Sequence, residues 1–262
     1  MTRWRHVFSL AWPPLVFGLA FLLLWELAVR VFDFQPYFLP APSAIWDAFR
    51  ATTSLIWEAT KVSGLNALLG LLIGTAIGVA MAFLLARFRL VDDLLSPLAV
   101  ALNAIPIFVL VAVFNNMYPV TSEVPRRLMV TLVVYFIVLI NVARGLHEVG
   151  AVYLDLMRSY AASDITILRK VRVPHAVPYL FIALKIAAPA SVITAFVSEY
   201  FGGLQNGLGS RIVSNIALSN NAEAWAYVLG ACLLGLAFFL AAVALEGVAT
   251  PGGLGARERD RA

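Results

Sequence analysis

Residues 65–86 read LNALLGLLIGTAIGVAMAFLLA and contain no charged side chain. A helix needs roughly 20 apolar residues to cross a bilayer. Lipid offers no hydrogen-bond partner to the backbone, so a segment that crosses it must be a helix or part of a closed barrel. Because this run is continuous and does not alternate between apolar and polar residues, it predicts a membrane-spanning helix.

The whole chain has the composition that this segment suggests. Of its 262 residues, 61% are hydrophobic and 13% are charged, whereas about a quarter of a soluble domain is charged. The first apolar run follows Arg3 and Arg5, but it is too long for a secretory signal, contains Glu26 and lacks a cleavage site. We therefore expect an all-α, polytopic membrane protein with about six transmembrane helices, forming a single transmembrane domain over residues 1–262. The predicted spans are 15–31, 65–86, 94–114, 128–146, 179–200 and 225–248.

Basic residues between the runs predict how the chain is oriented. Cytoplasmic loops of membrane proteins carry an excess of Lys and Arg. This bias places both termini in the cytoplasm and the chain in the cell membrane as a multi-pass protein, although Arg126 and Arg127 then fall on the outside and count against it. The three histidines are scattered and the one cysteine lies in an apolar run, so we expect no metal site.

The longest predicted cytoplasmic connection contains the most informative stretch. Residues 155–180 read DLMRSYAASDITILRKVRVPHAVPYL, and the segment 150–177 is too polar to span a membrane. Ile165, Leu168 and Val171 recur at helical spacing, which predicts a short amphipathic helix. Such a helix can dock into a groove of a partner protein. A helix that lies on the lipid headgroups is the alternative.

Polar residues and a proline are expected to bound this helix. Ser163 or Asp164 can cap its start, and an acid there suits the positive end of the helix dipole. Pro174 is predicted to end it, since proline lacks a backbone donor and disfavours helix in the preceding residue.

This segment resembles the signature loop of the binding-protein-dependent ABC importer permeases. In that signature Glu-Ala-Ala is followed by a glycine and, about a dozen residues later, by Ile-x-Leu-Pro. Here Asp155-Leu156-Met157 takes the first place, Ala161 takes the place of the glycine, and Val171-Arg172-Val173-Pro174 takes the last. The sequence therefore departs from the signature at Asp155 and at Ala161, where alanine bends less freely than glycine.

Further matches extend the resemblance from about Leu39 to Arg211. They are similar to the branch of sulfonate, nitrate, taurine and bicarbonate permeases, which also includes riboflavin and thiamine-precursor permeases. The matching segments are Leu39-Pro40-Ala41-Pro42-Ser43, Asn103-Ala104-Ile105-Pro106, Asn141 with Gly145-Leu146, and Glu199 with Asn206-Gly207-Leu208-Gly209.

The resemblance implies a type I ABC importer permease of a prokaryotic cell membrane. Two permease copies or paralogues would pair, dock on a cytoplasmic ATP-binding subunit, and receive a small solute from an extracytoplasmic substrate-binding protein. The branch suggests a sulfonate, taurine, a nitrate-like anion, or a heterocycle like riboflavin or a thiamine precursor. The ATPase-coupling residues implied are Asp155, Arg158, Ala161, Ser163, Asp164, Ile165, Leu168 and Pro174.

The chain is expected to be a transport subunit and not an enzyme. It has no G-x-x-x-x-G-K-[ST] phosphate loop, so ATP would bind to the partner and no cofactor to this chain. We expect no nucleic-acid partner. An ion-coupled secondary transporter is the alternative function, although it would need a carboxylate at mid-membrane depth and internal repeats.

Four residues are candidates for the translocation pathway. Asn103 and Pro106 lie in the third run, where proline would expose backbone groups to a cavity. Glu199 and Tyr200 end the fifth run and would line its outer mouth. The alternatives are an interhelical hydrogen bond for Asn103 and a solvated helix end for Glu199.

Three glycines in the second run are spaced for helix packing. Gly70, Gly74 and Gly78 form two overlapping G-x-x-x-G units, which let another helix approach closely. Packing within the subunit is the favoured interpretation, and a seam in a moving core is the alternative.

Overall fold

The structure is a computed structural model that describes residues 2–88, 105–202 and 205–249. Within these ranges the regular elements are all helical. They are α1 (Thr2–Val31), α2 (Pro42–Ala51), α3 (Thr53–Arg87), α5 (Ile107–Met117), α6 (Val124–His147), α7 (Ala151–Ser159), α8 (Asp164–Ile167), the π-helix η1 (Leu168–Arg172), α9 (Val173–Tyr200), α10 (Leu208–Ala217) and α11 (Asn221–Ala249).

Five described segments are long and apolar enough to cross a membrane: Trp12–Val31, Thr53–Arg87, Val124–His147, Asp164–Tyr200 and Asn221–Ala249. They contain all or nearly all of five of the six predicted spans, and the all-α polytopic prediction is confirmed. The other predicted span, 94–114, lies partly outside the described residues, and its last part begins α5.

The core of the molecule is built from α3, α6 and α9. Gly70, Gly74 and Gly78 of α3 lie against α6, where a Cβ at Gly74 would be 2.7 Å from the carbonyl oxygen of Thr131. That separation is too short for any side chain, so glycine is what allows the two backbones to come together. Val134 of α6 fills the space beside Gly74. The glycine stripe therefore serves packing within the subunit.

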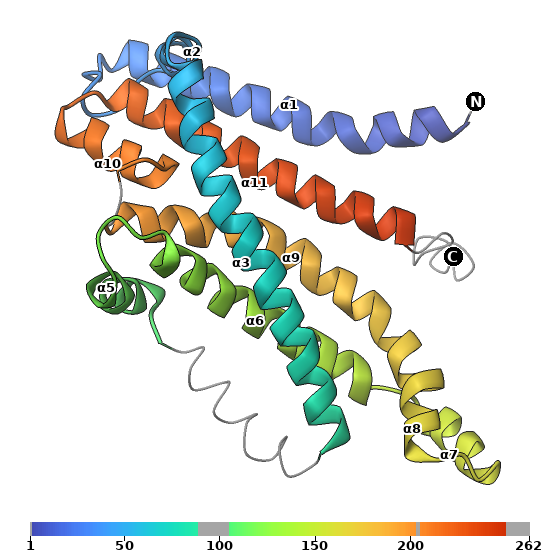
Figure 1. Ribbon diagram of the computed structural model, residues 1–262. Coiled ribbons are helices and arrows are strands. Elements are labelled where there is room, and N and C mark those ends of the chain that lie inside the picture. Colours follow the sequence, from blue (N-terminus) through green and yellow to red (C-terminus); the bar gives the residue numbers. More distant parts are fainter. Residues whose placement is uncertain (1, 89–104, 203–204, 250–262) are drawn as a thin grey trace.

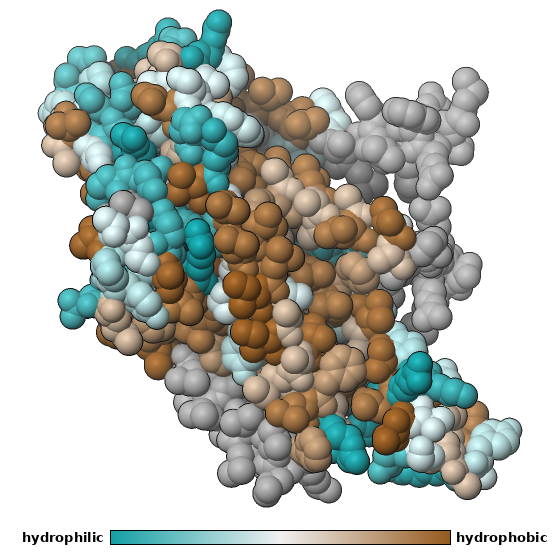
Figure 2. Space-filling model, viewed as in Figure 1, coloured by the Kyte–Doolittle hydropathy of each residue, from teal (hydrophilic) through white to brown (hydrophobic). Residues whose placement is uncertain are grey.

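The helices run between two polar ends (Figure 1). At one end lie α2, α10 and the beginning of α11, and we call it the α10 end. At the other lie α7 and α8, and we call it the α7 end. The beginning of α1 and the end of α11 point to the same side of the molecule as α7 (Figure 1). Apolar surface covers the middle of the molecule, and hydrophilic residues gather at its two ends (Figure 2), as expected for a chain with lipid around its centre.

Pro174 does not end a helix, and this prediction was wrong. The chain stays helical from Asp164 to Tyr200 because the π-turn η1 precedes the proline. In this turn the N–H of Val173 donates to the carbonyl of Leu168, five residues earlier. The wider turn changes the hydrogen-bond register just before Pro174, which then occupies the first turn of α9, where the missing N–H of proline costs little.

Candidate functional site

The α7 end turns sharply between α7 and α8. Ala161 has φ +53°, in the left-handed region that favours glycine. The N–H of Ala161 donates to the carbonyl of Arg158 at 2.8 Å, and the N–H of Ala162 donates to that of Met157 at 3.1 Å. These two bonds form a Schellman motif, which caps the end of a helix through a left-handed residue. The position where the resemblance expects a glycine is therefore the one that needs glycine geometry.

The next helix begins at the predicted cap. The Ser163 hydroxyl accepts from the N–H of Thr166 at 3.4 Å and bonds the Thr166 hydroxyl at 2.9 Å. Asp164 follows in the first turn of α8 and is exposed. Ser163, one of the two predicted caps, thus fixes where α8 starts.

The apolar residues of this segment divide into two groups. Ile165 is 64% exposed, and Leu156 and Tyr160 of the α7 segment are also exposed. Leu168 is turned inward and packs on the core between α3, α6 and α9. The expectation that Ile165 and Leu168 share one exposed face is therefore wrong, because the helix leads directly into α9 and Leu168 lies where it joins the bundle.

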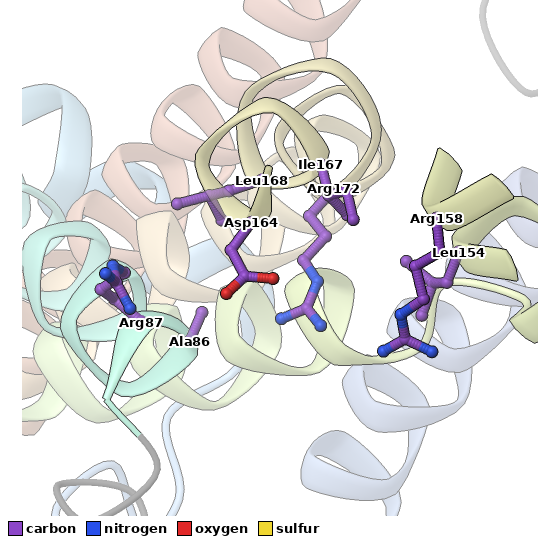
Figure 3. A pocket seen from close by; sticks show the side chains of 8 residues that line it. All are labelled: Ala86, Arg87, Leu154, Arg158, Asp164, Ile167, Leu168 and Arg172. Atoms are coloured by element: carbon purple, nitrogen blue, oxygen red, sulfur yellow. The ribbon is translucent and has the colours of Figure 1, made fainter. Parts of the chain in front are cut away.

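A pocket of about 190 Å³ lies between the end of α3, α7 and the helical segment that leads into α9 (Figure 3). It brings three predicted coupling residues, Arg158, Asp164 and Leu168, together with two arginines that were not among the predicted coupling residues, Arg87 and Arg172. The described residues that line it are Ala86, Arg87, Leu154, Arg158, Asp164, Ile167, Leu168 and Arg172.

The remaining predicted coupling residues are exposed; they are Asp155, Ala161, Ser163, Ile165 and Pro174. Asp155 and Arg158 form an ion pair at 3.4 Å, and both side chains are about 70% exposed. A pair in water is worth little, about 0–1 kcal/mol. Pro174 is exposed at the start of α9.

Glu199 lies at the α10 end and is almost completely enclosed. It is 1% exposed, and its Oε2 accepts from the Ser63 hydroxyl at 2.8 Å and from the N–H of Gly209 at 3.0 Å. A Cβ at Gly207 would lie 2.2 Å from the carboxyl carbon of Glu199. The glycines after α9 thus form the cradle of this carboxylate, and the interpretation of Glu199 as a solvated helix end is wrong. Its role in the pathway remains a prediction.

A second polar cluster surrounds Glu123, just before α6. Glu123 accepts from Arg126 at 2.7 Å, from Asn206 at 2.9 Å and from Asn66 at 2.8 Å. Burial raises the pKa of Glu123, but the hydrogen bonds from Asn206 and Asn66 and the charge of Arg126 outweigh it, so the pKa lies below its ordinary value. Arg127 donates to Asn66 at 3.0 Å. The cluster ties α3 and α6 to the loop before α10.

Sequence reasoning treated Arg126 and Arg127 only as signals of orientation and missed this cluster. Arg126 is 1% exposed, which a count of charges in loops cannot show. The spacing of Glu123 and Arg126 at i and i+3 was the local signal that could have paired them.

The other candidates for the translocation pathway that the structure describes are more exposed than Glu199. Pro106 precedes α5 as its N-cap and is exposed, and Tyr200 is 40% exposed with its ring 5.3 Å from that of Phe201. Asn103 lies outside the described residues. Among the residues that the structure describes, no group of three or more His, Cys, Asp or Glu side chains could hold a metal ion.

Comparisons with known proteins match this architecture. Residues 74–252 match the family described as the binding-protein-dependent transport system inner membrane component. A probable ABC transporter permease protein of Haemophilus influenzae is 33% identical over 205 residues, covering 77% of this chain and 81% of that protein. The formylaminopyrimidine transport permease protein ThiX of Halalkalibacterium halodurans is 26% identical over 244 residues, covering 92% of this chain and 96% of that protein.

A solved structure shares the fold. A chain of the MetNI methionine ABC transporter, in inward-facing conformations, superposes with a TM-score of 0.57 at 19% identity, covering 76% of this chain and 95% of that chain. The helical core, the turn at Ala161 and the match over residues 74–252 lead to one assignment. This chain belongs to the family of binding-protein-dependent inner-membrane components, the permease subunits of ABC transporters.

Proposed function

We propose that this chain is the membrane-spanning subunit of an ATP-driven importer, and that α7 and α8 dock on a separate ATPase subunit in the cytoplasm. Two copies or paralogues would enclose the path of a small solute brought by a substrate-binding protein. ATP binding and hydrolysis on the partner would then drive the change between inward-open and outward-open states.

The observation that carries this proposal is the exposed apolar surface of α7 and α8. Val152 is 78%, Tyr160 is 76% and Ile165 is 64% exposed, in a segment that projects from the α7 end (Figure 1). Large apolar side chains exposed on a segment outside a bilayer favour a place where another protein binds. The tip around these residues carries hydrophilic groups as well (Figure 2), which suits a surface in water better than one inside lipid.

A second pocket, between α5 and α6, supports a translocation pathway near Pro106. A pocket of about 200 Å³ lies there, and the described residues that line it are all apolar: Ile105, Ile107, Leu110, Met129, Leu132, Val133 and Phe136. Such a lining offers no fixed charge to a small anion and suits the flat face of a heterocycle. ThiX is named for formylaminopyrimidine, so a heterocycle of that kind is our first candidate substrate, ahead of sulfonates, taurine and nitrate-like anions.

The docking surface can be tested by co-purification. The chain would be expressed with candidate ATPase subunits and purified in detergent as wild type, Ile165→Asp and Tyr160→Asp. Leu218→Asp is the matched control, since Leu218 is 70% exposed at the opposite end. A charge in the centre of a docking surface costs about 2 kcal/mol or more of binding free energy. We therefore expect the first two variants to bind the ATPase roughly thirtyfold more weakly than wild type, and the control to bind it as wild type does.

Leu168→Asp is unsuited to this test because Leu168 packs on the core. Docking through α7 and α8 is contradicted if Ile165→Asp and Tyr160→Asp retain the ATPase as well as wild type does. Uptake by proteoliposomes that contain the assembled importer and a binding protein then tests the substrate. Faster uptake of taurine than of formylaminopyrimidine would overturn the preference for a heterocycle.

A further inference from the structure

The arginine-lined pocket at the α7 end lies where two spanning helices leave the apolar middle of the molecule. Arg87 is the last residue of α3, and Arg172 is the last residue of η1, immediately before α9. The pocket is closed on its third side by Leu154 and Arg158 of α7 (Figure 3). Its position is therefore that of the headgroup region of the adjacent leaflet.

The charges of the pocket favour an anion. Among the described residues, three arginines and one aspartate line it. Asp164, Leu168 and Arg172 share one helical face because they are spaced by four residues, and Asp164 and Arg172 point the same way in Figure 3. Within the described part of the chain no ion pair to Arg87 or Arg172 is formed at 4.0 Å or less, whereas Arg158 has its long, exposed contact with Asp155.

The pocket also has an apolar wall. Ala86 contributes to it from α3, Leu154 from α7, and Ile167 and Leu168 from the helix that leads into α9. A free inorganic anion would gain nothing from these groups. A lipid would, because its glycerol and first acyl carbons can lie along apolar side chains while its phosphate meets the guanidinium groups.

We propose that this pocket binds the phosphate of an anionic phospholipid, such as phosphatidylglycerol, from the leaflet at the α7 end. Basic pockets between spanning helices bind such headgroups, and the fork of a guanidinium matches a phosphate better than an ammonium does. The bound headgroup would bridge the end of α3 to η1 and α7, so that lipid composition would set how firmly the segment α7–α8 is held.

The test uses the full chain in nanodiscs of phosphatidylcholine mixed with phosphatidylglycerol. Native mass spectrometry would count the lipid that stays bound as the disc is stripped with detergent. The variants are Arg172→Gln and Arg87→Gln, and Arg169→Gln is the matched control, since Arg169 is exposed in the same π-turn but does not line the pocket. We expect phosphatidylglycerol to be retained preferentially, with about a fivefold loss for each pocket variant and no change for the control.

Several results would overturn the proposal. Equal losses for Arg169→Gln and Arg172→Gln would show that diffuse surface charge attracts the lipid. Equal retention of phosphatidylglycerol and phosphatidylcholine would show that the pocket does not select an anionic lipid. If inorganic phosphate raises the melting temperature in pure phosphatidylcholine discs through Arg172, while phosphatidylglycerol shows no preference, the ligand is a free anion and not a lipid. Ile165→Asp separates this inference from ATPase docking, since that variant should lose the ATPase and keep the lipid.

Discussion

The two ends of the molecule hold their polar groups in opposite ways. At the α10 end, hydrogen bonds join residues far apart in the sequence: Ser63 and Glu199 are separated by 136 positions, and Glu123 and Asn206 by 83. At the α7 end the side-chain bonds within α7 and α8 are local, with Asp155 and Arg158 only 3 positions apart. The α10 end is therefore held by bonds across the fold, whereas α7 and α8 are held mainly by their own turns.

This difference indicates where the molecule can change. Long-range buried bonds break only when several helices separate, so opening the α10 end costs more free energy than a local rearrangement does. Exposed local bonds can rearrange while the spanning helices stay in place. A segment of this kind suits a surface that must follow a partner, and the variants below test the contrast.

The largest expected effect is at the α10 end, from Arg126→Ala. Arg126 is 1% exposed and donates to Glu123 and Asn206, so its removal leaves both without their charged partner. Breaking a buried pair from one side costs about 3 kcal/mol or more. Arg211→Ala is the control, because Arg211 is exposed in the neighbouring α10. The melting temperatures of the two variants in detergent would measure this difference. Similar decreases for Arg126→Ala and Arg211→Ala would mean that the cluster around Glu123 does not hold this end together.

The second largest loss of stability is expected from Gly209→Ala, with Gly150→Ala as its control. The new Cβ at Gly209 would lie 2.2 Å from the carbonyl oxygen of Phe196, whereas at Gly150 the nearest side-chain atom is 3.5 Å away. Overpacking of this kind costs about 1–3 kcal/mol, while an exposed substitution at the α7 end stays within about 0.5 kcal/mol. Equal melting temperatures for the two variants would contradict the tight approach of α9 and the loop before α10.

At the α7 end, neighbouring alanines should respond with opposite signs. Ala161→Gly relieves the left-handed strain of a φ of +53°, a gain of about 1–2 kcal/mol that the greater freedom of unfolded glycine reduces to about 0.5–1 kcal/mol. Ala162→Gly has no such strain to relieve and should destabilise the turn by about 0.5–1 kcal/mol. Amide hydrogen exchange of the turn measures both. If both glycines speed exchange, Ala161 is not in the left-handed conformation in solution.

The smallest expected effect is a dependence on pH. The pKa of Glu123 is lowered on balance, as described above, and hydrogen bonds from Arg144 and Tyr179 lower the pKa of Glu148. A lowered carboxyl pKa means that the stabilisation is complete above the ordinary value of 4.5 and is lost as the pH falls through the lower folded-state value.

Glutamine variants separate the two acids. Glu123→Gln should lower the melting temperature at neutral pH, and the difference from wild type should disappear in acid. For Glu148→Gln we expect a smaller loss in melting temperature and a smaller change of that loss with pH, because Glu148 is exposed at the α7 end. A larger effect for Glu148→Gln would reverse the contrast between the two ends.

Much of the fold could be predicted because hydropathy and length are local properties. Residues 65–86 contain enough apolar length for a spanning helix in any surroundings. Ser163 could be recognised as a cap for the same reason, since a cap acts on the helix that immediately follows it. The turn at Ala161 was expected only through the resemblance, and the structure adds its cause, the left-handed backbone.

What the sequence by itself determined, then, is which segments are apolar enough to cross a membrane and where a short helix begins after Ser163. Tertiary structure decided the rest. It placed Glu199 in a cradle of glycines, turned Arg126 inward, gathered Arg87 and Arg172 around one pocket, and let the helix continue through Pro174. The physical reason is that an apolar run carries its own free energy of transfer into lipid, whereas a buried polar group depends on partners that only the packed helices bring within reach.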